Sequence, residues 1–118
     1  MIGGSPHAQR VEYRIAAADI NPHVALAAAI GSGLWGIEQR IEPDAPIVGN
    51  AYDAPTTPGR ALPATLWDAA QRLRGSEAAR DLFGAEFVDH YAATREWEER
   101  QARKAVTDWQ LARYFEII

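Results

Sequence analysis

The residues best suited to chemistry in this chain alternate near its start, at Arg10, Glu12 and Arg14. Successive side chains of a strand point to opposite faces, so an extended stretch over 10–15 would place these three charges on one face and apolar side chains on the other. Guanidiniums bind phosphate or carboxylate oxygens in pairs, and a glutamate offers a hard oxygen to a divalent cation. The pattern therefore suits an anionic, metal-bound ligand. The alternative is a solvent-exposed ladder of charges that does no chemistry.

The elements that must position these side chains are one strand and a following helix. Residues 10–15 form the only convincing strand pattern, and a strand cannot satisfy its backbone groups alone, so its partners must come from elsewhere. Asn21 suits a helix N-cap and Pro22 the first helical position, which predicts a helix to about Arg40. This helix is rich in alanine and glycine, and we expect it to pack closely against a sheet or another helix.

The rest of the chain predicts a loop and then helices. Residues 41–61 are rich in proline and glycine, and a loop of this length usually has a functional role or contacts another subunit. The helical segments that follow are Leu66 to Gly75, Ser76 to Gly84, Ala85 to about Ala105, and a last helix from Thr107 or Asp108. Within the third segment, Glu96 with Arg100 and Glu99 with Arg103 have the spacing of ion pairs on one helix face. Its second half should be solvated.

Composition excludes several classes of function. The 118 residues suffice for one small domain, and a net charge of −4 gives no general attraction to nucleic acid or to an anionic membrane. The absence of cysteine rules out disulfides and thiolate metal sites and favours a reducing compartment, so we expect the cytoplasm. The longest apolar stretch, 24–37, is too short to cross a bilayer, and the first residues lack the features of a signal peptide.

Other short patterns do not indicate a site. Residues 31–36 match Gly-x-Gly-x-x-Gly, but they lie late in a predicted helix, whereas the dinucleotide-binding pattern follows a strand and opens a helix. Gly3-Gly4-Ser5 has no nearby lysine and is no phosphate-binding loop. The three histidines are scattered and lack metal-ligand or triad spacing.

Seven motifs, in this order and spacing over essentially the whole chain, give it a family resemblance. It resembles the C-terminal part of the glutamine synthetase catalytic domain. The motifs are Arg10-Val11-Glu12-Tyr13-Arg14, Asp19-x-Asn21-Pro22, Gly33-Leu34-Trp35-Gly36-Ile37, Asn50-Ala51-Tyr52-Asp53, Leu62-Pro63-x-x-Leu66, Leu82-Phe83-Gly84-x-x-Phe87-Val88 and Val106-Thr107-Asp108-Trp109.

The resemblance implies an α+β fold class, in which 1–118 is a mostly helical C-terminal segment of the catalytic domain. Its N-terminal strand would need a sheet from a part of the domain that this segment lacks, as it lacks the N-terminal β-grasp domain. The implied activity is an ATP-dependent ligation of glutamate with ammonia or an amine through a γ-glutamyl phosphate. It uses Mg²⁺ or Mn²⁺, and it takes place in a homo-oligomer of stacked rings.

The resemblance also implies roles for individual residues. Glu12 would hold the metal that bridges the phosphates, Arg10 would contact the ATP phosphates and the transferred phosphoryl group, and Arg14 would bind the substrate. Tyr52 lies in a loop that resembles the one where some bacterial members are adenylylated. The interpretation we favour for Tyr52 is that its ring packs under the loop, because many members share such a loop without being modified.

The amine substrate is not determined by this stretch. Glu96-Trp97-Glu98 and Val106-Thr107-Asp108-Trp109 look more like the branch that includes γ-glutamylpolyamine synthetases than like the housekeeping enzyme. We expect the isolated chain to be inactive, since Glu12 supplies only one or two of the roughly six oxygens that a hard cation takes. A hypothesis from another class is a non-catalytic helical interaction module or a gene remnant.

Aromatic and apolar residues outside the strand are expected to anchor a core or an interface. We expect this of the four tryptophans, Trp35, Trp67, Trp97 and Trp109. The last ten residues are crowded with large apolar side chains, and we expect them to be buried against another part of the enzyme or another subunit.

Overall fold

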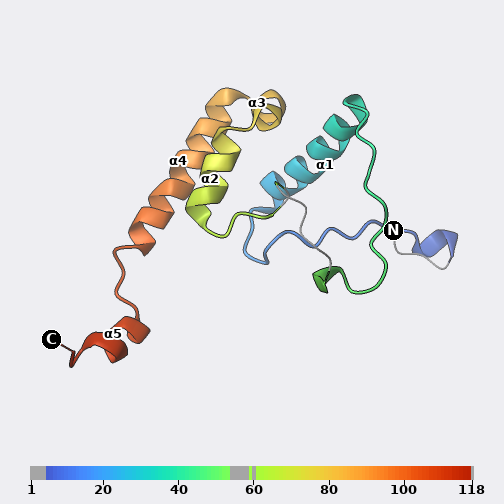
Figure 1. Cartoon of the computed structure of the whole chain (residues 1–118). Coiled ribbons are helices and arrows are strands. Elements are labelled where there is room, and N and C mark those ends of the chain that lie inside the picture. The colour runs from blue at the N-terminus through green and yellow to red at the C-terminus, as the bar shows by residue number, and fades with distance from the viewer. Residues whose placement is uncertain (1–4, 54–58, 60, 118) are drawn as a thin grey trace. The chain divides into compact units, whose positions relative to one another are not determined.

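The computed structural model describes residues 5–53, 59 and 61–117 of this chain (Figure 1). Over these residues it is mostly helical, and it divides into two compact units, Met1–Glu42 and Pro43–Ile118. The elements are a 3₁₀ turn at Pro6–Ala8, α1 (Pro22–Glu38), a 3₁₀ turn at Ala51–Asp53, α2 (Leu66–Arg74), α3 (Glu77–Phe83), α4 (Ala85–Ala102) and α5 (Asp108–Tyr114).

The strand expected over 10–15 is not confirmed. Arg10 has a single bridge, and residues 11–15 have no regular secondary structure. The physical reason is the one that the sequence indicates: a strand forms only when a neighbouring strand takes its backbone N–H and C=O groups, and the described residues contain no such neighbour. The helical part of the expected fold class is therefore observed, and the sheet is not.

Helix α1 begins where its capping residues predict. The Asn21 side chain accepts hydrogen bonds from the backbone N–H groups of His23 at 3.0 Å and Val24 at 3.3 Å, and Pro22 is the first helical residue. The helix ends at Glu38, two residues before the expected Arg40, which adopts a positive φ of 52°. A left-handed residue cannot continue a right-handed helix, so the end is set by the backbone at Arg40.

The close packing expected around α1 is not observed. Only Gly31 is buried, and a β-carbon added at Gly33 or Gly36 would meet no atom within 4 Å. Large apolar side chains on the same helix, among them Ile30 and Leu34, are more than half exposed. Nothing in the described residues offsets the cost of glycines inside this helix, which is about 1 kcal/mol each relative to alanine.

The second unit contains a corner of three helices, α2, α3 and α4, that pack on one another (Figure 1). Thr65 and Ser76 cap α2 and α3, because their hydroxyl oxygens accept hydrogen bonds from Asp68 N–H and Ala79 N–H, each at 3.1 Å. Gly84 ends α3 at a φ of 84°, which allows α4 to start at once in a new direction. These starts and ends match the ones predicted from sequence.

The core of this corner is small. Its buried apolar residues are Ala70 on α2 and Val88 and Ala92 on α4, with exposed fractions of 2%, 0% and 0%. Ring contacts extend it along the surface, where Phe87 lies between Phe83 and Tyr91 with centroid separations of 5.4 and 5.7 Å. Small residues at the α2–α4 contact let the two helix backbones approach each other closely.

The chain after the corner ends in a short capped helix. Helix α4 stops at Ala102, three residues short of the expected Ala105. Thr107 then caps α5 with a full capping box, in which it exchanges hydrogen bonds with Gln110. No other part of the described chain covers the apolar side chains of this end, and Trp109 and Phe115 are 67% and 81% exposed. Their expected burial is thus not seen within this chain.

The tryptophans do not form a core in the described chain. Trp35, Trp97 and Trp109 are 37%, 53% and 67% exposed, and Trp67, on α2, is half-buried. None of the helices described has both the length and the apolar character needed to cross a membrane.

Candidate active site

The candidate site is the segment that carries the alternating charges. Arg14 donates a hydrogen bond from Nε to Glu12 Oε1 at 2.5 Å, so these two side chains, two residues apart, meet on one side of the segment. Both are accessible, with 79% of the Arg14 side chain and 36% of the Glu12 side chain exposed. The hydrogen bond, and then the charge of Glu12, raise the pKa of Arg14 above its ordinary value. Arg10 takes no part in this ion pair.

The other side of the segment faces α1. Tyr13 and Ile15 line an open hollow together with alanines of α1, among them Ala28 and Ala29. An alternation of charged and apolar faces was expected from the sequence, and it holds here for residues 12–15 although they form no strand. Tyr13 and Ile15 are nevertheless 61% and 59% exposed, so α1 covers this side of the segment only in part.

A divalent metal fits this segment only in part. Glu12 offers one accessible carboxylate, which is a suitable hard ligand for Mg²⁺ or Mn²⁺. The described residues contain no cluster of three or more histidine, cysteine or acidic side chains able to bind a metal. Glu12 alone is therefore not a metal site, and a metal bound there would take its other ligands from outside the described residues.

Tyr52, the candidate modification site, lies in the 3₁₀ turn Ala51–Asp53. Asn50 accepts a hydrogen bond from Tyr52 N–H at 3.2 Å and donates one to Asp53 at 2.9 Å, which fixes the turn. The Tyr52 side chain is 96% exposed. Our favoured expectation, that the ring packs under the loop, is therefore wrong for this structure, because no described residue covers the ring.

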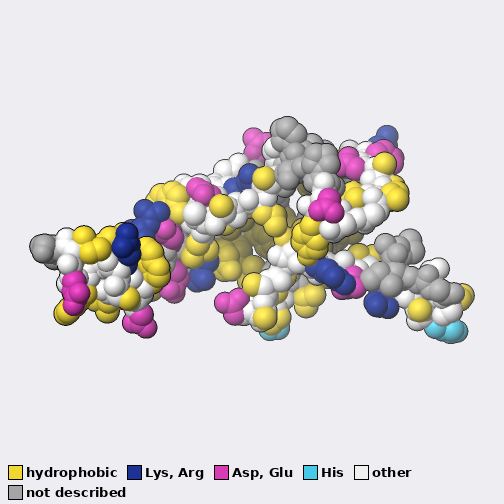
Figure 2. Space-filling model, turned by 60° about the horizontal axis from the view of Figure 1, so that its bottom comes forward, with side chains coloured by type: hydrophobic (Ala, Val, Ile, Leu, Met, Phe, Trp, Pro, Cys, Tyr) yellow, Lys and Arg dark blue, Asp and Glu magenta, His cyan; other side chains and the backbone are white. Residues whose placement is uncertain are grey.

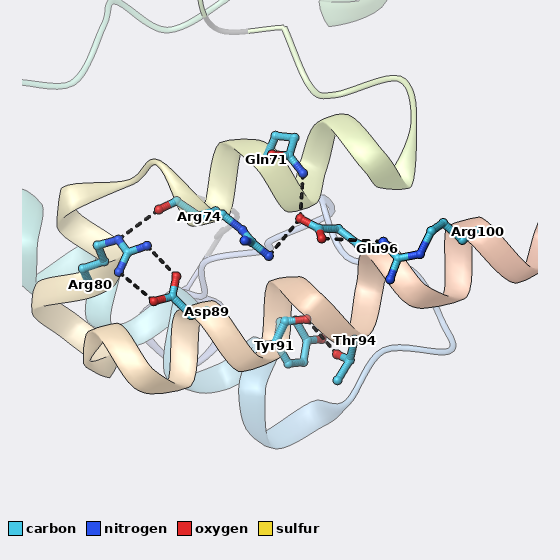
Figure 3. A network of polar contacts seen from close by, with 8 residues as sticks. All are labelled: Gln71, Arg74, Arg80, Asp89, Tyr91, Thr94, Glu96 and Arg100. Carbon is cyan, nitrogen blue, oxygen red and sulfur yellow. Dashed lines mark hydrogen bonds and ion pairs between the residues drawn. The ribbon is translucent and has the colours of Figure 1, made fainter.

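Sequence reasoning missed a polar network that joins α2, α3 and α4 (Figure 3). The Glu96 carboxylate accepts a hydrogen bond from Gln71 Nε2 at 2.7 Å and pairs with Arg74 Nη2 at 2.9 Å. The expected pair with Arg100 is present but longer, at 3.8 Å, and the Glu96 side chain is only 13% exposed. The sequence offered only the local spacing of Glu96 and Arg100, since its partners on α2 are more than twenty residues away.

A second group of contacts in the same network centres on Arg80. Its guanidinium forms two bonds to the Asp89 carboxylate, at 2.6 and 3.3 Å, and its Nε donates to the backbone carbonyl of Arg74 at 2.9 Å. These bonds lower the pKa of Asp89 below its ordinary value and raise that of Arg80. The bonds of this network run between helices, so we interpret it as structural.

Many large apolar side chains of the described residues are exposed. Figure 2 shows them spread among charged groups over the visible face. Val11, Ile37, Val48 and Phe115 are each at least three-quarters exposed. Surfaces of this kind mark contacts with other protein when they are contiguous.

Comparison with known proteins identifies the family. Residues 1–114 match the family described as the glutamine synthetase catalytic domain. The chain belongs to this family. The resemblance inferred from the order of its sequence motifs is thus confirmed. No solved structure matches this chain.

Curated relatives carry several ligase names. The chain is 49% identical over 111 residues to a glutamate–isopropylamine ligase of a Pseudomonas species, covering 94% of this chain and 24% of that protein. It is 41% identical over 113 residues to a γ-glutamylethanolamide synthetase of Streptomyces coelicolor, covering 96% and 24%. It is 40% identical over 114 residues to type-1 glutamine synthetase 2 of Dictyostelium discoideum, covering 94% and 22%. The chain thus spans about a quarter of the length of these relatives.

Proposed function

We propose that this chain is the C-terminal segment of an ATP-dependent ligase that joins ammonia or a primary amine to the γ-carboxylate of glutamate. The observation that carries the proposal is the family match over residues 1–114, together with relatives named as ligases of glutamate with different amines. In the proposed reaction the γ-phosphoryl group of ATP moves to the glutamate γ-carboxylate. The amine nitrogen then attacks the acyl phosphate, phosphate leaves, and an amide bond forms.

The charged segment supplies three groups to this reaction. Glu12 contributes one carboxylate to a Mg²⁺ or Mn²⁺ site, and the metal supplies charge neutralisation for the phosphates when bound. Arg10 contacts the ATP phosphates and stabilises the phosphoryl group in flight, and Arg14 binds the substrate. The contact between Arg14 and Glu12 supports a common site for these two residues, because it holds a guanidinium and a carboxylate adjacent and accessible to one metal-bound anionic ligand.

The same proposal extends to the surroundings of the chain. Residues 10–15 become a strand when the rest of the catalytic domain supplies its neighbours, and the exposed apolar surface of α1 is covered at the same time. The ligase works in the cytoplasm as a homo-oligomer. The exposed ring of Tyr52 is accessible for modification, and we retain this residue as a candidate site.

Two measurements test the proposed function. The purified 118-residue chain should not turn over ATP with glutamate and ammonia or isopropylamine, because it lacks the other metal ligands. A hybrid ligase, in which this chain replaces the matching segment of the Pseudomonas relative, should form the amide. Glu12→Ala in this hybrid should remove most activity and shift the metal requirement. Glu86→Ala, which removes an exposed carboxylate from α4, is the matched control and should have no effect.

Two results would contradict the proposed function. Magnesium-dependent ATP turnover by the isolated chain, lost on Glu12→Ala, would show that the site is more complete than we propose. A folded hybrid that keeps full activity with Glu12→Ala would remove the role of the charged segment. In that case Arg10, Glu12 and Arg14 would be the surface ladder of charges.

A further inference from the structure

The contact between Arg14 and Glu12 joins two groups to which the proposed reaction gives different partners. Arg14 Nε donates to Glu12 Oε1 at 2.5 Å, and within the described chain this is the only ion pair of either residue. The side chains are 79% and 36% exposed, so a ligand can reach both from solvent. In the proposed reaction, however, Arg14 binds the glutamate substrate and Glu12 binds the metal. The two groups therefore start out bound to each other instead of to those ligands.

The contact lowers the affinity of Arg14 for a second carboxylate. A guanidinium binds a carboxylate best through two parallel N–H bonds, and the bond to Glu12 already occupies the Nε edge of Arg14. The charge of Glu12 also repels an anionic substrate that approaches the remaining N–H groups. Glu12 thus competes with the substrate carboxylate as a group of the same chemical kind.

A divalent cation bound to Glu12 would reverse both effects. Its charge exceeds that of the carboxylate, so the substrate anion is attracted where it was repelled, and the carboxylate oxygens bind the cation in place of Arg14 Nε. The exchange is easy because the ion pair is exposed, and exposed pairs shift an equilibrium by only about fivefold or less. A contact of this strength weakens substrate binding without preventing it.

We propose that the ion pair of Glu12 and Arg14 couples metal binding to substrate binding: Glu12 competes with glutamate for Arg14 until a divalent cation binds Glu12. The inference deepens the proposed function and rests on it. It assigns Glu12 an effect on the substrate in addition to its role toward the metal. Because coupling between two ligands is reciprocal, metal and glutamate should each tighten the binding of the other by the same factor.

Equilibrium dialysis of radiolabelled glutamate against the hybrid ligase tests this without catalysis, because ATP is left out. Glu12→Gln keeps the size of the side chain and removes its charge. In the presence of EDTA this variant should bind glutamate about two- to fivefold more tightly than the unchanged hybrid. Added Mn²⁺ should tighten binding to the unchanged hybrid by a similar factor and should have little effect on Glu12→Gln.

The matched control is Glu99→Gln, which removes the carboxylate of another ion pair of 2.5 Å, to Arg103, far along the chain from the charged segment. It makes the same change in net charge, and its glutamate binding should equal that of the unchanged hybrid with and without Mn²⁺. Equal tightening in Glu99→Gln and Glu12→Gln would assign the effect to net charge and overturn the inference.

Other outcomes separate the inference from the proposed function. Unchanged or weaker metal-free glutamate binding by Glu12→Gln, with Glu12→Ala inactive, would overturn the inference alone. An equal effect of Mn²⁺ on Glu12→Gln and on the unchanged hybrid would do the same, because the metal would then act on the substrate without Glu12. Full activity of Glu12→Ala would overturn the proposed function, and this inference with it.

Discussion

Arg10 and Arg14 are the same residue type but differ in their surroundings. Arg14 is paired with Glu12, while Arg10 lies outside that pair. In the hybrid ligase, Arg14→Ala should raise the Michaelis constant for glutamate, because it removes a contact made in the ground state. Arg10→Ala should instead lower kcat, because the partner that we propose for it is the phosphoryl group in flight. Steady-state kinetics at saturating Mg²⁺ measures both, and equal effects of the two variants would contradict the assigned roles.

For the charged segment, the sequence predicts which side chains share one side of the backbone more reliably than it predicts the secondary structure. Period-two alternation places Glu12 and Arg14 on one side because that is a property of any extended backbone. Whether the backbone also forms a strand depends on a partner outside the segment. The side that Tyr13 takes was therefore predictable, and the absence of a strand in the described residues was not.

At the scale of elements, helix starts were predictable because their causes are local. At each start a capping side chain accepts a hydrogen bond from a backbone N–H group two or three residues later in the chain. The capping residues are Asn21, Thr65, Ser76 and Thr107. Contacts between helices were not predictable in this way. The bond from Gln71 to Glu96 joins residues far apart in sequence, and no short-range pattern encodes it.

Glu96 should matter more to stability than Glu99, although both have an arginine four residues later. Glu96→Ala removes bonds to Gln71 and Arg74 and leaves Arg74 without its partner, which should cost about 1 to 2 kcal/mol. Glu99→Ala removes one pair along a single helix, to Arg103, which should cost about 0.3 to 0.5 kcal/mol. Urea unfolding of the chain followed by circular dichroism compares the two. Equal midpoints would show that the network adds nothing to the local pairs.

The ion pair between Arg80 and Asp89 should make the stability of the helical corner decrease at acidic pH. Hydrogen bonds from Arg80 lower the pKa of Asp89 below its ordinary 3.8. A carboxylate with a lowered folded-state pKa contributes stability that is fully present above 3.8 and is lost as the pH falls through the folded value. The wild-type chain should therefore melt at a higher temperature than Asp89→Asn near neutral pH.

This difference should narrow only when the pH falls below that ordinary value. Melting curves of both chains from about pH 6 downward measure it. Asp81→Asn is the matched control, since Asp81 lies on α3, is exposed and forms no ion pair within the described chain. A difference that stays constant at all pH values would assign the effect of Asp89→Asn to packing.

At the scale of the whole molecule, burial is incomplete. Only Ala70, Val88 and Ala92 are buried apolar residues in the described chain, whereas large side chains such as Leu26, Ile37 and Phe115 are exposed. An apolar side chain contributes roughly 1.5 to 3 kcal/mol when fully buried, so this surface represents a large unrealised stabilisation. The length comparison agrees with this, because the chain spans about a quarter of its relatives.

The last ten residues provide the sharpest test at this scale. Its large apolar side chains are all more than half exposed, so this end packs little against the rest of the described chain: Trp109, Leu111, Tyr114, Phe115 and Ile117. We expect it to be buried against another part of the ligase or another subunit. Deletion of residues 109–118 from the hybrid ligase should therefore lower the assembled mass, measured by light scattering, before it affects chemistry in the molecules that remain assembled. Trp97→Ala, which removes an aromatic side chain that is 53% exposed from α4, is the comparison. Because each large side chain adds roughly 1.5 to 3 kcal/mol when buried, an unchanged mass together with unchanged thermal stability would rule out an anchoring role for this end.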